Sequence, residues 1–386
     1  MVRFIEIEGS HYTMGIKQGI EILEVYEKLF SQILVSDLFK KVKPKLIPTG
    51  LLLNAFAWLS KRMIKNSLIE HTPKQHEFIL GLAEGLEISE NFGYMVNFLE
   101  VITGHPKLTM TWPKELKNLI ACTQLFALSS TTTDGNDYLA RNYDFPNELE
   151  DYQIVRLTKP EDGYKTICMT QVCLAGTHQG MNEKGLAIAQ NYGRGWRKEF
   201  KDYKLKGVPA SIIIQNALET CATMDEAVDF ITKFPNRTNG AHYGILDKEG
   251  NACIVETTAT RHAFRYPENG ILAHTNLYMT EELMNANVPE TVNWKTEHMT
   301  RPYYLSPKRR HERANELINT MKGNLNREEL YKILSDHNNR EPDDDTVCTH
   351  GEVGSTLATI TAIPKRLEFW VTDTFPCKSQ QEKFTI

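Results

Sequence analysis

Residues 121–145 read ACTQLFALSSTTTDGNDYLARNYDF. Two segments rich in apolar and β-forming residues, TQLFALS and DYLARNYDF, flank the turn sequence TDGN at residues 133–136. This pattern is typical of a β-hairpin. The first strand begins with a cysteine, Cys122, in the interior of the chain. A cysteine in such a position is either a small core residue or a nucleophile that the preceding chain masks.

The composition is that of a globular protein: of 386 residues, 41% are hydrophobic and 24% are charged. This length allows one large domain or two ordinary ones. A net charge of −5 gives no general reason to bind nucleic acid or an anionic membrane, so neither is expected as a partner. The most apolar run, LLLNAFAWL at residues 51–59, is too short to cross a bilayer, and the first ten residues lack the apolar stretch of a signal peptide.

The seven cysteines form no CxxC pair, and no Cys/His group has the spacing of a common zinc motif. We therefore expect free thiols, a reducing compartment and no metal site, and the chain implies no cofactor. The predicted location is the cytoplasm.

The predicted secondary structure changes near residue 120, from mainly helices to mainly strands. Before it, apolar residues recur at helical spacing over residues 22–33, and Thr72 and Pro73 begin a capping-box pattern. After it, hairpins are predicted at residues 177–192 and 242–258, and final strands at 355–364 and 366–375. Helices are predicted at 210–221, from Thr223, from Ser306 to about Gly323, and from about Asn326. Hairpin-rich sheets with helices between them favour stacked sheets that helices cover, an α+β architecture.

A catalytic thiol needs a base, and no histidine lies near Cys122 in the sequence. If the bond between Ala121 and Cys122 were cut, the new α-amino group, with an ordinary pKa of about 7.7–8.0, would lie beside the sulfur as a base. Asp144 is then a candidate to hold this amine, and Arg141 to orient the carboxylate or the substrate. Their offset of three places them on opposite faces of an ideal strand, so a bulge or strand end would be needed to join them.

The intermediate of acyl transfer also needs hydrogen-bond donors for its oxyanion, which side-chain amides supply. Asn191, after GLAIAQ, and Asn276, in AHTNLY, each follow a predicted strand and are the candidates.

Ten segments carry, in this order, a resemblance to a known family: GSHYTMGIKQG, HEFILGLAEGLEI, ACTQLFA, LARNYDF, NEKGLAIAQN, HTNLY, SPKRRHERANEL, LSDH, VCTHGEVGSTLATITAI and WVTDTFPC. Together they extend from residue 9 to residue 377. The chain resembles the acyl-coenzyme A:aminopenicillanate acyltransferase family of N-terminal-nucleophile hydrolases, relatives of the choloylglycine (bile-salt and penicillin V) hydrolases.

The resemblance implies a four-layer αββα sandwich with a helical N-terminal segment at residues 1–121 and a catalytic chain at 122–386. It implies an inactive precursor in which Cys122 attacks the carbonyl of Ala121 and forms a thioester by an N-to-S acyl shift. Water then releases two chains, which are expected to stay associated; a homodimer is also compatible.

The resemblance also assigns the site. Arg141 and Asp144 match the family's R-N-x-D segment, Asn276 matches its T-N segment, and Arg309 is taken as the distal arginine of a serine-and-arginine helix. Ala121 stands where relatives often have glycine, and Leu277 where many have histidine. The expected substrate is a small N-acyl amide or acyl thioester, attacked by Cys122, with water or an amine taking the acyl group.

Two other functions remain open from the residues. One is an unprocessed Cys/His hydrolase that pairs Cys122 with a distant histidine such as His274 or His350. The other is a catalytically silent ligand-binding protein on the same scaffold.

Overall fold

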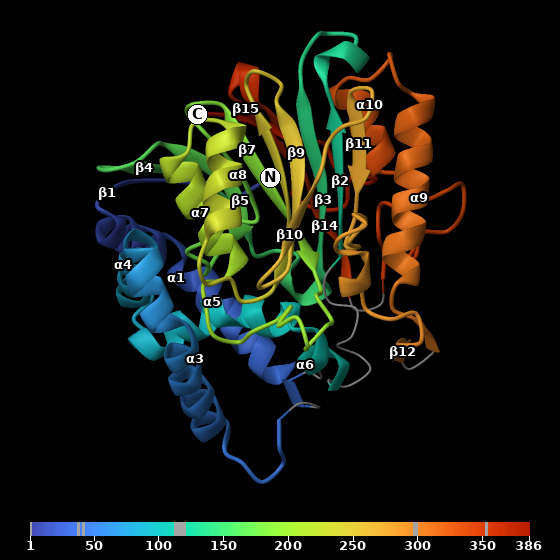
Figure 1. The fold of residues 1–386 in the computed structure, drawn as a ribbon. Coiled ribbons are helices and arrows are strands. Elements are labelled where there is room, and N and C mark those ends of the chain that lie inside the picture. The colour runs from blue at the N-terminus through green and yellow to red at the C-terminus, as the bar shows by residue number, and fades with distance from the viewer. Residues whose placement is uncertain (1, 37–38, 41–42, 112–120, 296–299, 352–353) are drawn as a thin grey trace.

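Two β-sheets lie face to face in the computed structural model, with helices on the outer side of each (Figure 1). The structure describes residues 2–36, 39–40, 43–111, 121–295, 300–351 and 354–386. Three groups of buried side chains fill the spaces between the four layers. The expected αββα sandwich is therefore confirmed.

The first sheet has eight strands in the described residues. Their spatial order is β1 (Phe4–Gly9), β4 (Gln153–Pro160), β5 (Thr166–Gln171), β6 (Gln179–Asn182), β7 (Leu186–Gly193), β8 (Gly240–Asp247), β9 (Ala252–Thr257) and β10 (His262–Arg265). Neighbouring strands are antiparallel except for β1, which pairs with β4 in parallel, Phe4 opposite Val155.

The second sheet has six strands in the described residues. Their spatial order is β11 (Ile271–His274), β2 (Ala121–Ala127), β3 (Tyr138–Pro146), β14 (Gly354–Ile363), β15 (Glu368–Val371) and β16 (Glu382–Thr385). All its pairs are antiparallel, and a register shift between Thr356 and Ala358 interrupts the pairing of β14 with β3. A separate ribbon joins β12 (Asn293–Lys295) to β13 (Thr300–Pro302).

The helices divide between the two outer faces. Those packed on the first sheet, or on helices that cover it, are α1 (His11–Val35), α3 (Thr49–His71), α4 (Pro73–Gly85), α5 (Glu90–Gly104), α7 (Ala210–Thr220) and α8 (Met224–Lys233). Those packed on the second sheet are α9 (Leu305–Thr320) and α10 (Arg327–Leu334). The short α6 (Pro106–Thr111) contacts α5. Among the described residues, none of these helices has the length and apolarity that a bilayer crossing requires.

Close packing of α1 on α4 explains two of the quoted segments, GSHYTMGIKQG and HEFILGLAEGLEI. A Cβ atom at Gly15 would collide with the backbone carbonyl of Phe78, and one at Gly81 with that of Tyr12. Only glycine lets the two backbones approach so closely. These segments therefore have a packing role in the helical layer.

The predicted hairpins are confirmed as β2–β3, β6–β7 and β8–β9. Helices α7, α8 and α10 begin where predicted, and the side chains of Thr223 and Asn326 cap the last two. The capping box at Thr72 is wrong, although α4 does begin at Pro73. The Thr72 hydroxyl donates to the carbonyl of Leu68 at the end of α3, because that helix runs almost directly into the next.

The N-terminal segment is helical as expected, but it also contributes β1, which the sequence did not indicate. The buried side chains of Ile5 and Ile7 belong to the core between the first sheet and its helices. The described part of this segment is thus built into the sandwich, since its first strand forms an edge of the larger sheet.

Candidate active site

Cys122 is the second residue of β2, and its side chain is fully buried. It lies opposite Tyr143 of β3, whose ring belongs to the core between the two sheets. The same pairing register puts Gln124 opposite Arg141 and Ala121 opposite Asp144. Because side chains alternate along a strand, Cys122 and Arg141 face the sheet interface, whereas Asp144 faces the helical layer of α9 and α10.

The thiol contacts Arg141 directly. Its Sγ atom lies 2.9 Å from Nη2 of Arg141. Nε of the same guanidinium donates to Oδ1 of Asn191 in β7, at 3.3 Å. Asn191 is itself fixed, because its Nδ2 donates to the backbone carbonyls of His274 and Thr275. Asn191 therefore positions Arg141 across the sheet interface, and its amide donors are occupied rather than free for an oxyanion.

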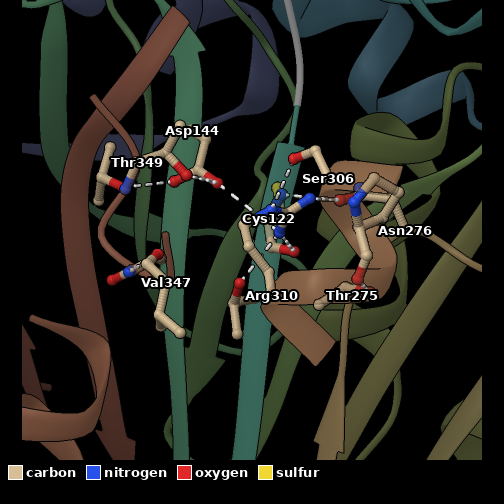
Figure 2. A network of polar contacts seen from close by, with 12 residues as sticks. Cys122, Asp144, Thr275, Asn276, Ser306, Arg310, Val347 and Thr349 are labelled. Atoms are coloured by element: carbon tan, nitrogen blue, oxygen red, sulfur yellow. Dashed lines mark hydrogen bonds and ion pairs between the residues drawn. The ribbon is translucent and has the colours of Figure 1, made fainter. Parts of the chain in front are cut away.

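The backbone of Cys122 is held from the other side (Figure 2). Its N–H donates to Oδ1 of Asn276 at 2.9 Å, and its carbonyl accepts from Nη1 of Arg310 at 2.8 Å. Nη2 of Arg310 also donates to Oδ1 of Asn276, at 3.0 Å. Asn276 and Arg310 therefore form one cradle around the first peptide units of β2.

Asp144 completes the site from the helical side. Its carboxylate accepts from Thr356 at 2.7 Å and from Thr349 at 3.4 Å, and it lies 4.0 Å from Nη1 of Arg310. The opposite-face placement of Arg141 and Asp144 is thus observed, and no bulge in β3 reverses it. Arg141 contacts the sulfur of Cys122 on one face of the sheet. Asp144 lies on the other face, opposite Ala121 and so close to the backbone of Cys122.

Burial dominates the electrostatics of this uncut chain. It raises the pKa of the Cys122 thiol, while Arg141, the backbone N–H of Asp144 and Arg310 act in the opposite direction. Burial also raises the pKa of the Asp144 carboxyl, against the opposing charge of Arg310. The pKa of Arg310 is lowered by burial in turn. The thiol is therefore a poor nucleophile by itself while the chain before it remains in place.

A small pocket adjoins the peptide bond before Cys122. Ala121, Asp144, Asn276 and Arg310 are among its lining residues. Its volume is about 20 Å³, which is room for about one water molecule. Ala121 itself forms part of the pocket wall.

Arg310, and not the expected Arg309, is the arginine of α9 that the structure places at Cys122. Arg310 is fully buried and holds Cys122, whereas the half-exposed side chain of Arg309 pairs with Asp345. Helix periodicity carried the missing signal. The buried face of α9 contains Ser306, Arg310, Ala314 and Ile318, each four residues apart, and this face turns position 310 inward and 309 outward.

The structure does not bring a histidine to Cys122 among the hydrogen bonds of the described residues. Nδ1 of the buried His274 lies 2.9 Å from Nη1 of Arg265. Nε2 of His350 lies between two other thiols, those of Cys348 and Cys377. Neither arrangement supports a Cys/His pair at Cys122.

Two sheets between helical layers, with a cysteine at the start of a central strand and polar side chains gathered on it, define the class of N-terminal-nucleophile hydrolases. Residues 131–372 match the model of the acyl-coenzyme A:6-aminopenicillanic acid acyl-transferase family. The chain belongs to this family. The matched segment includes Arg141, Asp144, Asn191, Asn276 and Arg310 but begins after Cys122.

Solved structures offer weaker similarities. A Caenorhabditis elegans ortholog of N-acylethanolamine-hydrolyzing acid amidase is 14% identical, with a TM-score of 0.44 over 63% of this chain and 93% of that one. A mutant conjugated bile acid hydrolase from Clostridium perfringens is 14% identical, with a TM-score of 0.40 over 69% and 97%. Penicillin V acylase from Agrobacterium tumefaciens is 16% identical, with a TM-score of 0.41 over 65% and 82%. These values are too low to carry an activity to this chain, and no curated protein has a significantly similar sequence.

Proposed function

We propose that the chain is an autoprocessed cysteine amidohydrolase or acyltransferase that acts on linear amides or thioesters through an acyl group on Cys122. The observation that carries this proposal is the cradle around the backbone of Cys122. A cysteine with only a core role needs no side-chain partner for its peptide N–H. Here the N–H of Cys122 donates to Asn276, and Arg310 donates to the same oxygen of Asn276. The same oxygen would hold the α-amino group that cleavage creates.

Self-cleavage would begin with attack of Cys122 Sγ on the carbonyl carbon of Ala121. A C–S bond forms, the peptide C–N bond breaks, and the thiol proton ends on the new amine. Water then hydrolyses the thioester, so that Ala121 gains a carboxylate and Cys122 regains its thiol. The contacts that Arg141 and Arg310 make to the sulfur and carbonyl of Cys122 support this reaction.

In turnover, the α-amino group of Cys122 takes the thiol proton as the sulfur attacks the acyl carbon of the substrate. It then returns the proton to the leaving amine, and water or another amine accepts the acyl group. Arg141 stabilises negative charge on the sulfur, and Asn276 keeps the amine within reach. Asp144 balances the charge of Arg310, and both are buried, so each needs the other.

The two chains are proposed to remain together after cleavage. Buried polar contacts support this, because Gln18 of α1 donates to the carbonyl of Val172 and accepts from Arg156 of β4. His11 and Gln75 both bond Glu219 of α7. The free thiol nucleophile also fits the expected cytoplasmic location, which stays a prediction.

Intact-mass measurement of freshly purified protein tests the proposal. Wild type is expected to give two chains, the larger beginning at Cys122, while Cys122→Ala stays a single chain. Cys173→Ala is the matched control, since Cys173 is another free, half-buried cysteine and should not affect cleavage. A panel of N-acyl amides should then leave an acyl group on Cys122 of the wild type only.

A single unbroken wild-type chain that turns over these amides would contradict the proposal and favour an unprocessed hydrolase. A chain that binds acyl ligands equally well with and without the Cys122 thiol, and turns over none, would favour a silent binding protein.

A further inference from the structure

Four metal-binding side chains from three separate segments converge beside the second sheet. His337 lies just after α10, Cys348 and His350 lie in the stretch that leads into β14, and Cys377 follows β15. One potential ligand atom of each lies within 4.8 Å of the corresponding atom of every other. None of the four contacts Cys122, so this cluster is separate from the candidate active site.

The spacing of these atoms fits a tetrahedral metal. Nε2 of His350 lies 3.3 Å from Sγ of Cys348 and 3.3 Å from Sγ of Cys377. In a tetrahedral zinc site with Zn–S of about 2.3 Å and Zn–N of about 2.0–2.1 Å, neighbouring ligand atoms lie about 3.5 Å apart. Only a small movement of these side chains would therefore be needed to bind a zinc ion.

Hydrogen bonding alone leaves this cluster incompletely satisfied. Nε2 of His337 is buried and has no hydrogen-bond partner in the described part of the chain. Nε2 of His350 faces two thiols although it can serve only one as acceptor. Buried polar atoms are normally paired, so an unpaired buried nitrogen on a histidine of this Cys/His cluster points to an additional ligand.

Aromatic contacts orient the two histidine rings of the cluster. The ring of His350 stacks on Phe375 with centroids 4.3 Å apart, and the ring of His337 meets it edge-on at 5.1 Å. The neutral imidazole of histidine is a common metal ligand. Two thiolates would balance the charge of a divalent cation, which favours a partly buried site.

We propose that His337, Cys348, His350 and Cys377 bind one Zn²⁺ ion as a structural Cys₂His₂ site. Two sulfur and two nitrogen ligands at tetrahedral spacing select zinc over the hard, oxygen-preferring cations. Binding releases the two thiol protons to solvent and involves no redox step. This proposal replaces the expectation of no metal site, which rested on sequence spacing alone.

The zinc site would also support the active site indirectly. Thr349 lies between the two ligands Cys348 and His350, and its hydroxyl donates to the carboxylate of Asp144. Its N–H donates to Thr356, whose hydroxyl donates to the same carboxylate. Fixing both neighbours of Thr349 would therefore help to hold Asp144 in place.

Metal analysis of protein purified under reducing conditions tests the proposal without any measurement of turnover. Wild type is expected to contain close to one zinc per chain, and metal-depleted protein given Co²⁺ should show the visible absorption of tetrahedral cobalt with a thiolate charge-transfer band. Cys377→Ser should lose both signals, and because Cys377 is exposed this variant should keep its fold, which circular dichroism checks. Cys173→Ser is the control and should keep both signals.

Two results would overturn the proposal. One is wild-type protein that neither retains zinc nor gives the tetrahedral cobalt spectrum. The other is a native disulfide between Cys348 and Cys377, seen as a cross-linked peptide before reduction, since its sulfurs could not act as thiolate ligands. Because the readouts are metal content and absorption, they do not depend on whether Cys122 is cleaved or catalytic.

Discussion

The side-chain oxygen of Asn276 accepts a hydrogen bond from the backbone nitrogen of Cys122, 2.9 Å away, although 154 residues separate the two in sequence. The loop after β11 thus reaches the one nitrogen that self-cleavage would convert into an amine. Because that oxygen also accepts from Arg310, its position is set independently of the bond that would break.

Replacing Asn276 with alanine should slow both self-cleavage and turnover by about 10- to 100-fold. A hydrogen bond to a charged group contributes about 1.5–3 kcal/mol, and about 1.4 kcal/mol corresponds to a factor of ten. Mass spectrometry follows cleavage over time, and acyl-amide hydrolysis follows turnover. Asn319→Ala, on the exposed side of α9, is the control, and equal rates in the two variants would argue against a role for Asn276.

The two adjacent arginines of α9 should differ sharply in stability when each is replaced by methionine in the uncut Cys122→Ala background. Arg310→Met leaves the buried Asp144 without its charge partner, so a loss of about 3–5 kcal/mol in unfolding free energy is expected. Arg309→Met removes a half-exposed arginine from the buried Asp345, so a smaller loss than for Arg310→Met is expected. Urea denaturation measures both, and similar losses would contradict the assignment of Arg310.

Asp144 should impose a pH dependence on stability. Burial raises its pKa in the folded chain above the value of about 3.9 expected when unfolded. Its contribution to stability is therefore fully present below about pH 3.9 and is lost as the pH rises through the folded pKa. In the Cys122→Ala background, the stability of Asp144→Asn relative to its parent should rise over that interval and then level off.

Urea denaturation at a series of pH values gives this difference. Replacing protonated Asp144 by asparagine gives an offset that does not change with pH, and the attraction of Arg310 for the ionised form is already part of the folded pKa. The change with pH is therefore the quantity to compare. Asp229→Asn, on the exposed face of α8, serves as the control. A difference for Asp144→Asn that stays flat, or that falls as the pH rises, would rule out a raised pKa.

Association of the two chains after cleavage should depend on β1. Ile7→Ala removes a buried side chain from the core shared by both chains, at a cost of about 2–5 kcal/mol. Its small chain should therefore dissociate at a lower urea concentration than that of wild type in size-exclusion chromatography. Glu8→Ala, the exposed neighbour, should behave like wild type; early dissociation in both variants, or in neither, would speak against this core contact.

The sequence sufficed wherever a local pattern decided the structure. The apolar segments on either side of TDGN predicted the β2–β3 hairpin, which the structure confirms. The register did not follow from that turn, because residues 128–137 form a longer connection that includes a 3-10 helix. The burial of Arg310 could also have been predicted from the sequence, because the spacing of Ala314 and Ile318 defines the buried face of α9.

The remaining features depend on contacts between distant segments, which no local pattern encodes. Strand β1 pairs with β4, which lies some 150 residues later in the chain. The alternation of apolar and polar residues in β1 is too short to predict a strand in a segment that is otherwise helical. The zinc ligands His337 and Cys377 lie on different elements, and only tertiary packing brings them together. Asn191 was expected as an oxyanion donor, whereas its contact with Arg141 arises only where the two sheets face each other.

Strand β1 also covers an edge. It borders β4, whose far side would otherwise present a row of unsatisfied amide and carbonyl groups to solvent. Such a border invites pairing with another molecule and, from there, aggregation. With β1 in place, the edge of the sheet is a strand whose exposed side chains include the charged Glu6 and Glu8. If the chain cleaves itself at Ala121, keeping the N-terminal chain bound would therefore protect the mature enzyme from self-association.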